Sequence, residues 1–322
     1  MKFFYILFII FFSLKTFSQE VSKIDCHLHF LDFTQQTVGF PKIVEAMDSA
    51  NVEKAIVFGM PIVKMWAEND VIQPEYYLDT DARAYYYSAT DYILAEHLLK
   101  QKKEIQDRFF PFISGINPLD QNSVNQIEIL LNIYPNFWKG IGEIMLRHDD
   151  LTGYIYGEFP RANHPAMMKI YQLAANHNLP IIIHHNISSV YNSKSIYVNE
   201  LKEVLKLNPN TKFIWAHAGI SRRIEVENHE EILEKLLVEY PNLHVDISWV
   251  IFDEIISENL EDWVKIIEKF PNRFVIGSDV LGNHKNYKEE IEKFDVLLKN
   301  LSEKTRRKVA RENILEIINE KD

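Results

Sequence analysis

The chain has 322 residues, and 47% of them are hydrophobic, which is enough apolar sequence to bury one large core or two modest ones. Its formal net charge is −11, because 46 Asp and Glu outnumber 35 Lys and Arg. This acidic balance argues against a basic surface for nucleic acid, so we expect a small-molecule substrate as the main partner. A homo-oligomer is compatible with the composition.

The first 18 residues have the pattern of an export signal. Lys2 precedes an apolar run over 3–12, and the small residues Thr16 and Ser18 occupy the positions that a signal peptidase reads. This run is shorter than the roughly 20 residues needed to span a bilayer, so a membrane anchor is the less favoured alternative. We predict a signal peptide over 1–18, a single mature domain over 19–322 without stable membrane insertion, and a periplasmic or secreted location.

Eight short apolar runs rich in β-branched residues follow along the chain, at 21–26, 54–58, 110–116, 139–144, 180–184, 212–216, 243–247 and 274–277. Segments with helical periodicity lie between them, at 41–50, 124–133, 166–177, 201–207, 230–238 and 263–270. Strands and helices that alternate eight times predict an α/β fold of the closed (β/α)8 TIM-barrel type. An open doubly wound sheet is the alternative, but GIGE at 140–143 lacks the third glycine of a dinucleotide-binding loop.

A long stretch between predicted strands 2 and 3, residues 59–109, is rich in aromatic side chains. We interpret it as an insertion that forms a lid or wall over the barrel mouth. A packing patch or a subunit interface is the alternative interpretation. The single cysteine, Cys26, excludes a disulfide within the chain and is expected to be a small core residue.

Residue types that bind metals recur where predicted strands end. His27 and His29 are two residues apart, so both imidazoles point to one side of an extended strand and can bind one cation. A carboxylate such as Asp279 completes a site that stays open to water. Active residues of TIM barrels come from the carboxyl ends of the strands. The candidates obey that rule, with Glu143 after strand 4, His184 and His185 after strand 5, and His217 after strand 6.

With these motifs the chain resembles the amidohydrolase superfamily, and within it the amidohydrolase-related branch of metal-dependent TIM-barrel hydrolases. The resemblance extends over 23–319 and includes a His-x-His after strand 1, a carboxylate after strand 4 and an Asp after strand 8. The pattern Leu-Pro, three apolar residues and His at 179–184 selects His184 over His185 as the ligand from strand 5. The resemblance implies the metal ligands His27, His29, Glu143, His184, His217 and Asp279.

The resemblance also implies a reaction, the hydrolysis of an ester, lactone or amide bond in a small molecule by a metal-bound hydroxide. Asp279 would take the proton of the water and pass it to the leaving group, as general base and then acid. His217 would bind a second metal or donate a hydrogen bond to the oxyanion. We expect one or two divalent metals per chain, zinc or alternatively manganese.

Two other functions stay open on the sequence alone. The same branch contains non-oxidative decarboxylases that use one metal, and a barrel can also keep its metal without catalysis. Substrate specificity in this architecture depends on the loops after the strands, and six residues there are candidate substrate contacts. They are Arg147, His148, His185, Arg222, Trp249 and His284.

Overall fold

The computed structural model describes residues 21–320 of the chain. The predicted signal peptide over 1–18 lies outside the described residues and stays a prediction. Among the described residues, no helix is long and apolar enough to cross a membrane.

Eight parallel strands form one sheet, in the order β1-β2-β5-β6-β7-β8-β9-β10. The sheet closes on itself through backbone hydrogen bonds from Cys26 to Ile276 (2.9 Å) and from His29 to Val280 (3.1 Å). The predicted TIM barrel is therefore confirmed. The strands are β1 (Lys23–His29), β2 (Val52–Phe58), β5 (Phe109–Ile113), β6 (Gly140–Met145), β7 (Ile181–His184), β8 (Phe213–Trp215), β9 (Leu243–Asp246) and β10 (Phe274–Val275).

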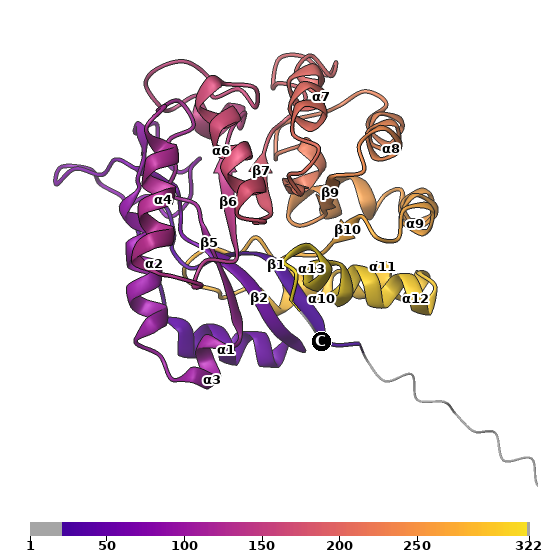
Figure 1. The fold of residues 1–322 in the computed structure, drawn as a ribbon, viewed down its shortest axis with the longest axis horizontal. Helices are drawn as coiled ribbons and strands as arrows, with labels where there is room; N and C mark the ends of the chain where they lie inside the picture. The colour runs from indigo at the N-terminus through magenta and orange to yellow at the C-terminus, as the bar shows by residue number, and fades with distance from the viewer. Residues whose placement is uncertain (1–20, 321–322) are drawn as a thin grey trace, which may run out of the picture.

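Helices surround this barrel (Figure 1). In α9 (Leu260–Lys269), Trp263, Ile266 and Ile267 are buried at the i, i+3, i+4 spacing of one helix face, whereas Lys265 on the opposite face is exposed. The same division explains the other long helices, α1 (Phe40–Ser49), α4 (Ser123–Ile133), α6 (Pro165–Asn176), α7 (Val198–Leu207) and α8 (His229–Glu239). The shorter ones are α5 (Asp149–Thr152), α10 (Tyr287–Glu292), α11 (Asp295–Asn300), α12 (Glu303–Arg307), η1 (Ala216–Gly219), η2 (Phe252–Ile256) and η3 (Lys308–Glu312).

The last helix, α13 (Asn313–Ile317), closes the amino end of the barrel. Ile314 and Ile317 belong to the same buried cluster as the inward-facing strand residues, and Cys26 is part of that cluster too. The amide of Asn313 donates to the carbonyl of Phe274 at 2.8 Å. Lys212, just before β8, donates to the carbonyl of Ile317 at 2.9 Å. The core of the barrel is thus sealed at this end, which leaves the carboxyl end for a site.

The segment between β2 and β5 contains the antiparallel pair β3 (Ile62–Lys64) and β4 (Ala84–Tyr86), followed by α2 (Ala89–Leu99) and α3 (Lys103–Gln106). The buried Lys64 donates to the carbonyls of Thr80 (2.9 Å) and Ala82 (2.6 Å). Its Nζ also lies 4.0 Å from the centre of the Tyr154 ring. Lys64 therefore fixes the connection between β3 and β4 against the segment that follows β6.

The contact of α13 with the barrel predicts a large loss of stability in Ile314→Ala. The variant should lower the free energy of unfolding by roughly 2–5 kcal/mol, because it leaves a cavity in the buried cluster. Urea unfolding followed by circular dichroism measures the loss. Ile133→Ala, which alters a half-exposed side chain on α4, is the control and should change stability little. Equal effects of the two substitutions would contradict this role of α13.

A second prediction concerns Asp91, whose buried carboxylate on α2 accepts hydrogen bonds from the backbone of Ser114 and Gly115. Burial raises its pKa to about 7, against the opposing effect of these hydrogen bonds. Because the folded protein favours the protonated form of Asp91, the contribution of this group to folding stability is complete below the ordinary pKa of 3.8. That contribution is lost as the pH rises through about 7.

The stability of the wild type relative to Asp91→Asn should therefore fall by about 1–4 kcal/mol between pH 4.5 and pH 8, because the amide does not ionise. Urea unfolding of both proteins across that range measures the change. Glu128→Gln, at an exposed position of α4, is the matched control and should give a difference that is constant with pH. A constant difference for Asp91→Asn as well would show that Asp91 does not titrate as described.

Candidate metal centre

A cavity of about 460 Å³ opens at the carboxyl end of the barrel. Its lining includes residues that lie in or just after five different strands, and these converge although they are far apart in sequence. They are His29, Glu143, His184, His217 and Asp279. The structure thus brings together the side chains predicted as metal ligands, with His27 directly behind them.

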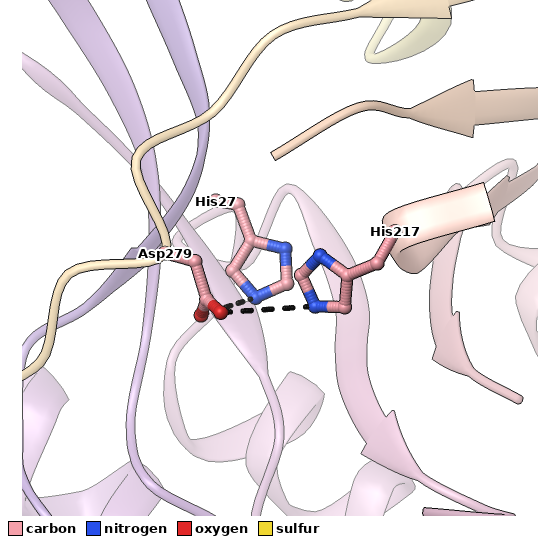
Figure 2. A group of neighbouring side chains, drawn as sticks. All are labelled: His27, His217 and Asp279. Atoms are coloured by element: carbon pink, nitrogen blue, oxygen red, sulfur yellow. Dashed lines mark ion pairs between the residues drawn. The ribbon is translucent and has the colours of Figure 1, made fainter. Parts of the chain in front are cut away.

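One half of the centre contains His27 and His29 at the end of β1. Their Nε2 atoms lie 3.2 and 3.3 Å from Oδ1 of Asp279, and 3.4 and 3.5 Å from Oε2 of Glu143. Figure 2 shows the Asp279 carboxylate facing the rings of His27 and His217, each from a different part of the barrel. Two imidazoles and two carboxylates therefore point at one small volume.

The other half contains His184 and His217. The Nδ1 atom of His184 lies 2.9 Å from Oε1 of Glu143, and Nε2 of His217 lies 3.6 Å from the same oxygen. The two oxygens of Glu143 thus face different histidine pairs. Within each of three overlapping groups, the nitrogen and oxygen atoms lie within 4.8 Å of one another, namely His27 with His29 and Glu143, His27 with His217 and Asp279, and Glu143 with His184 and His217.

Hydrogen bonds at the far side of the rings orient three of the four histidines. Nδ1 of His27 bonds to Oδ2 of Asp246 at 2.7 Å, and Nδ1 of His29 bonds to the carbonyl of Gly59 at 3.1 Å. Nδ1 of His217 bonds to the carbonyl of Ser248 at 3.2 Å. Because these acceptors take the Nδ1 proton, Nε2 of each ring is left as a lone-pair donor for a cation.

Sequence reasoning missed Asp246 as a member of the site. It ends β9, its carboxylate is fully buried, and Oδ2 also accepts from the hydroxyl of Ser248 at 2.8 Å. An acid at the end of an apolar strand was the available signal. Asp25 has a related role, because it accepts from the backbone of His27 (2.9 Å) and from the hydroxyl of Ser278 (2.7 Å). It thereby joins β1 to the segment that carries Asp279.

The backbone at the centre takes conformations that few residues adopt. Gly142 has φ +119°, and a Cβ placed there would lie 2.3 Å from the carbonyl oxygen of Ile182, so only glycine lets Glu143 come this close to β7. His217 (φ 53°) and Asp279 (φ 51°) are in the left-handed region, which costs energy for a residue with a Cβ. Such backbone strain concentrates at functional sites.

The charges of the centre shift the pKa values of its members. Burial alone raises the pKa of the Glu143 and Asp279 carboxyls, but the neighbouring imidazoles, His27 foremost, outweigh it and hold both pKa values below their usual range. For His27 burial lowers the pKa, and the two carboxylates outweigh it and raise the pKa. For His184 the effect of burial prevails and the pKa is lowered. The buried carboxylates are therefore ionised and require positive charge nearby.

The residues fit a divalent metal. A cation balances the buried carboxylates while the imidazoles stay neutral, and nitrogen and carboxylate ligands of this kind suit zinc. Nε2 of His27 is buried and has no hydrogen-bond partner among the described residues. A buried nitrogen of this kind is costly unless a ligand satisfies it, and it points between Glu143 and Asp279.

Three of the six candidate substrate contacts line the cavity, and three do not. His148, Arg222 and Trp249 line the cavity, and the His148 ring stacks on the His184 ring with centroids 4.2 Å apart. The cavity is also lined by Tyr76 and Tyr77 from the connection between β3 and β4.

The other three candidates, Arg147, His185 and His284, are not among the lining residues. Arg147 forms two hydrogen bonds to the Glu200 carboxylate at 2.8 and 2.6 Å, and His185 lies 3.2 Å from the same group. Nδ1 of His284 bonds to the carbonyl of Gly282 at 2.9 Å. These contacts hold loops together, and contact of the three residues with a substrate stays a prediction.

Comparison with known protein families shows to which family the chain belongs. The family described as Amidohydrolase matches residues 146–318, which is more than half of the chain. The chain belongs to the amidohydrolase family. The matched segment includes His184, His217 and Asp279, whereas His27, His29 and Glu143 precede it. No curated protein sequence matches the chain.

Solved structures share the fold of this chain at low sequence identity. An uncharacterized TIM-barrel protein from Bordetella bronchiseptica is 14% identical with a TM-score of 0.60, over 92% of this chain and 98% of that chain. A probable 2-pyrone-4,6-dicarboxylic acid hydrolase from Acinetobacter baumannii is 13% identical with a TM-score of 0.60, over 92% and 99%. A 2,6-dihydroxybenzoate decarboxylase from Rhizobium is 13% identical with a TM-score of 0.56, over 93% and 99%. At these identities the likeness shows the barrel fold alone.

The bond between His27 and Asp246 predicts a graded loss of metal affinity. Asp246→Asn removes the charge that orients the His27 ring and makes it basic, so zinc affinity should fall about 10- to 100-fold. Competition with a chromophoric chelator measures the affinity. The double variant His27→Ala with His29→Ala should have the lowest zinc affinity of the series, since it removes two predicted ligands. Wild-type affinity in Asp246→Asn would refute the orienting role, and wild-type affinity in the double variant would refute the centre itself.

Proposed function

We propose that this protein is a metal-dependent hydrolase that cleaves an ester, lactone or amide bond of a small molecule. The observation that carries the proposal is the position of Glu143, whose two carboxylate oxygens face two different histidine pairs. This arrangement supports two divalent cations, for which zinc is the favoured metal and manganese the alternative.

In this proposal His27, His29 and Asp279 would hold one cation and His184 and His217 would hold the other, with Glu143 between the two histidine pairs. When bound, such cations polarise the scissile carbonyl and lower the pKa of a coordinated water to about 7. Asp246, Gly59 and Ser248 keep the imidazoles in the orientation and tautomer that this requires.

Asp279 is the group that we assign to proton transfer. Both carboxylates line the cavity, but the Asp279 side chain is 13% exposed whereas that of Glu143 is 1% exposed and lies among histidines. Asp279 therefore faces both the ligand positions and the substrate. It accepts a proton from the attacking water and delivers it to the leaving group, which completes the cycle with the carboxylate unchanged.

Hydrolysis has two rivals, decarboxylation and metal binding without catalysis. The placement of Glu143 between two histidine pairs supports a pair of cations and so favours hydrolysis over a decarboxylase with one metal. A barrel that only binds metal does not need a carboxylate that faces the cavity, as Asp279 does. In ¹⁸O-labelled water, hydrolysis should place the label in the organic product. Release of CO₂ together with an organic product that carries no label would indicate the decarboxylase.

The proposal predicts that Asp279→Asn abolishes turnover while most metal stays bound. The amide keeps the shape of the side chain but does not accept the proton, so kcat should fall by at least about 100-fold. The measurement is hydrolysis of a panel of lactones, esters and amides, together with metal content per chain.

Glu289→Gln, an exposed acid-to-amide change on α10, is the matched control and should retain wild-type rates. Normal turnover in Asp279→Asn would remove the assigned base. A loss of metal equal to the loss of activity would instead show that Asp279 acts as a ligand alone.

A further inference from the structure

We propose that Glu200 positions the His184 ring for metal binding, by anchoring the loops that follow β6 and β7. This inference rests on the proposed function and adds to it a residue that does not line the cavity. The Nδ1 atom of His184 lies 2.9 Å from Glu143, and its Nε2 has no hydrogen-bond partner among the described residues. Because neither nitrogen bonds to a group away from the cation positions, the orientation of this ring depends on packing and on its backbone.

The Glu200 carboxylate joins the segments that follow two neighbouring strands. Its oxygens accept from Nε and Nη2 of Arg147 at 2.8 and 2.6 Å, and Nε2 of His185 lies 3.2 Å from Oε2. Arg147 follows β6, which contains Glu143, and His185 follows His184, the last residue of β7. One carboxylate therefore bridges the chain segments next to two of the predicted metal ligands.

The contact between Glu200 and Arg147 has the features of a rigid anchor. It is a pair of parallel charged hydrogen bonds, and the side chains are only 16% and 10% exposed. Burial raises the pKa of Glu200, but His185 and Arg147 outweigh it and lower the pKa to about 2. Glu200 lies in the first turn of α7, where the helix dipole stabilises negative charge. The Arg147 guanidinium also packs 3.5 Å from the centre of the Tyr197 ring, just before α7.

His185 links this anchor to β7. Adjacent residues of a strand point to opposite sides, so His184 faces the cavity while His185 faces Glu200. The backbone carbonyl of His185 accepts from Nε1 of Trp215 at 2.9 Å. The amide of the next residue, Asn186, donates to the carbonyl of Arg147 at 2.8 Å. Side chain and backbone directly after His184 are thus both fixed.

His148 links the anchor to the ring itself. It follows Arg147 directly, and its ring stacks on the His184 ring with centroids 4.2 Å apart and an interplanar angle of 19°. The Tyr77 ring lies across the His148 ring in a T-shaped contact, with centroids 5.0 Å apart. Release of Arg147 by loss of Glu200 would therefore let His148 shift, together with the histidine ring that it supports.

A role in stability alone is the alternative to this positioning role. Removal of Glu200 leaves the largely buried charge of Arg147 without its partner, which costs stability whether or not the metal centre is affected. Stability therefore does not distinguish the two roles. The position of the His184 ring and the affinity of each metal position distinguish them, because a purely stabilising ion pair affects neither.

The test compares the wild type with Glu200→Ala, Glu200→Gln and the control Glu203→Ala. Glu203 is an exposed acid on the same helix, and it accepts from the amide of Asn163 at 2.7 Å. Crystals of each protein grown without metal report the His184 ring directly. Competition with a chromophoric chelator measures the stepwise zinc affinities. Anomalous diffraction at one and at two equivalents of zinc shows which position each step fills.

We expect Glu200→Ala to displace the His184 ring in the metal-free crystals. Zinc at the position beside His184 and His217 should bind at least about tenfold more weakly, while zinc at the other position binds as in the wild type. Glu200→Gln keeps the size of the side chain and should give a smaller change of the same kind, so it carries the test if Glu200→Ala does not fold. Glu203→Ala should behave as the wild type.

An unchanged His184 ring in the Glu200 variants, or equal weakening of both zinc positions, would overturn the positioning role. Fewer than two zinc ions in the wild type would instead refute the proposed pair of cations. In that case a displaced His184 ring in the metal-free crystals of the Glu200 variants would still support the role of Glu200, and an unchanged ring would overturn it.

Discussion

The organisation of the site depends on one buried carboxylate, that of Glu143, held between two pairs of imidazoles. A carboxylate enclosed in this way is costly unless positive charge compensates it. Its neighbours supply ligand atoms on both sides, and Asp246 and Asp279 add further negative charge. Bound cations would compensate these negative charges, in keeping with the convergence of nitrogen and oxygen ligands at this end of the barrel.

The barrel tolerates this convergence of charged residues because its apolar packing lies at the opposite, amino end. Its inward-facing apolar residues and α13 close the amino end, so the carboxyl end is free to hold polar and strained residues. His217, Trp249 and Asp279 are all in the left-handed region, and Gly142 supplies the close approach next to Glu143. Secure packing at one end therefore accompanies local strain at the other.

Much of this arrangement is predictable from the sequence. Short apolar runs rich in β-branched residues locate the strands, and the rule that barrel sites lie at strand ends identifies His27, Glu143, His184, His217 and Asp279. The strand boundaries differ by a few residues. Strand β6 continues two residues past Glu143, with an irregular register between Ile141 and Ile144, so that Glu143 lies within the strand and not at its end.

The direction of side chains beyond the strand ends is not predictable in the same way. Arg147 and Arg222 look equivalent in the sequence, yet one pairs with Glu200 on α7 and the other lines the cavity. Their positions depend on residues far away in the chain, Glu200 and Tyr76, which no local pattern connects to them. Asp246 ends β9 and so obeys the strand-end rule, but its contact with His27, 219 residues away, is not visible in the sequence.

The central claim is tested most directly by locating metal in crystals of the protein prepared without chelator and supplied with zinc. Anomalous diffraction above and below the zinc absorption edge should show two peaks, one on each side of Glu143, each about 2.0–2.2 Å from histidine nitrogens. A single peak would remove the shared role of Glu143. The absence of any peak beside His27, His29 and Asp279 would contradict the account of this site as a metal centre.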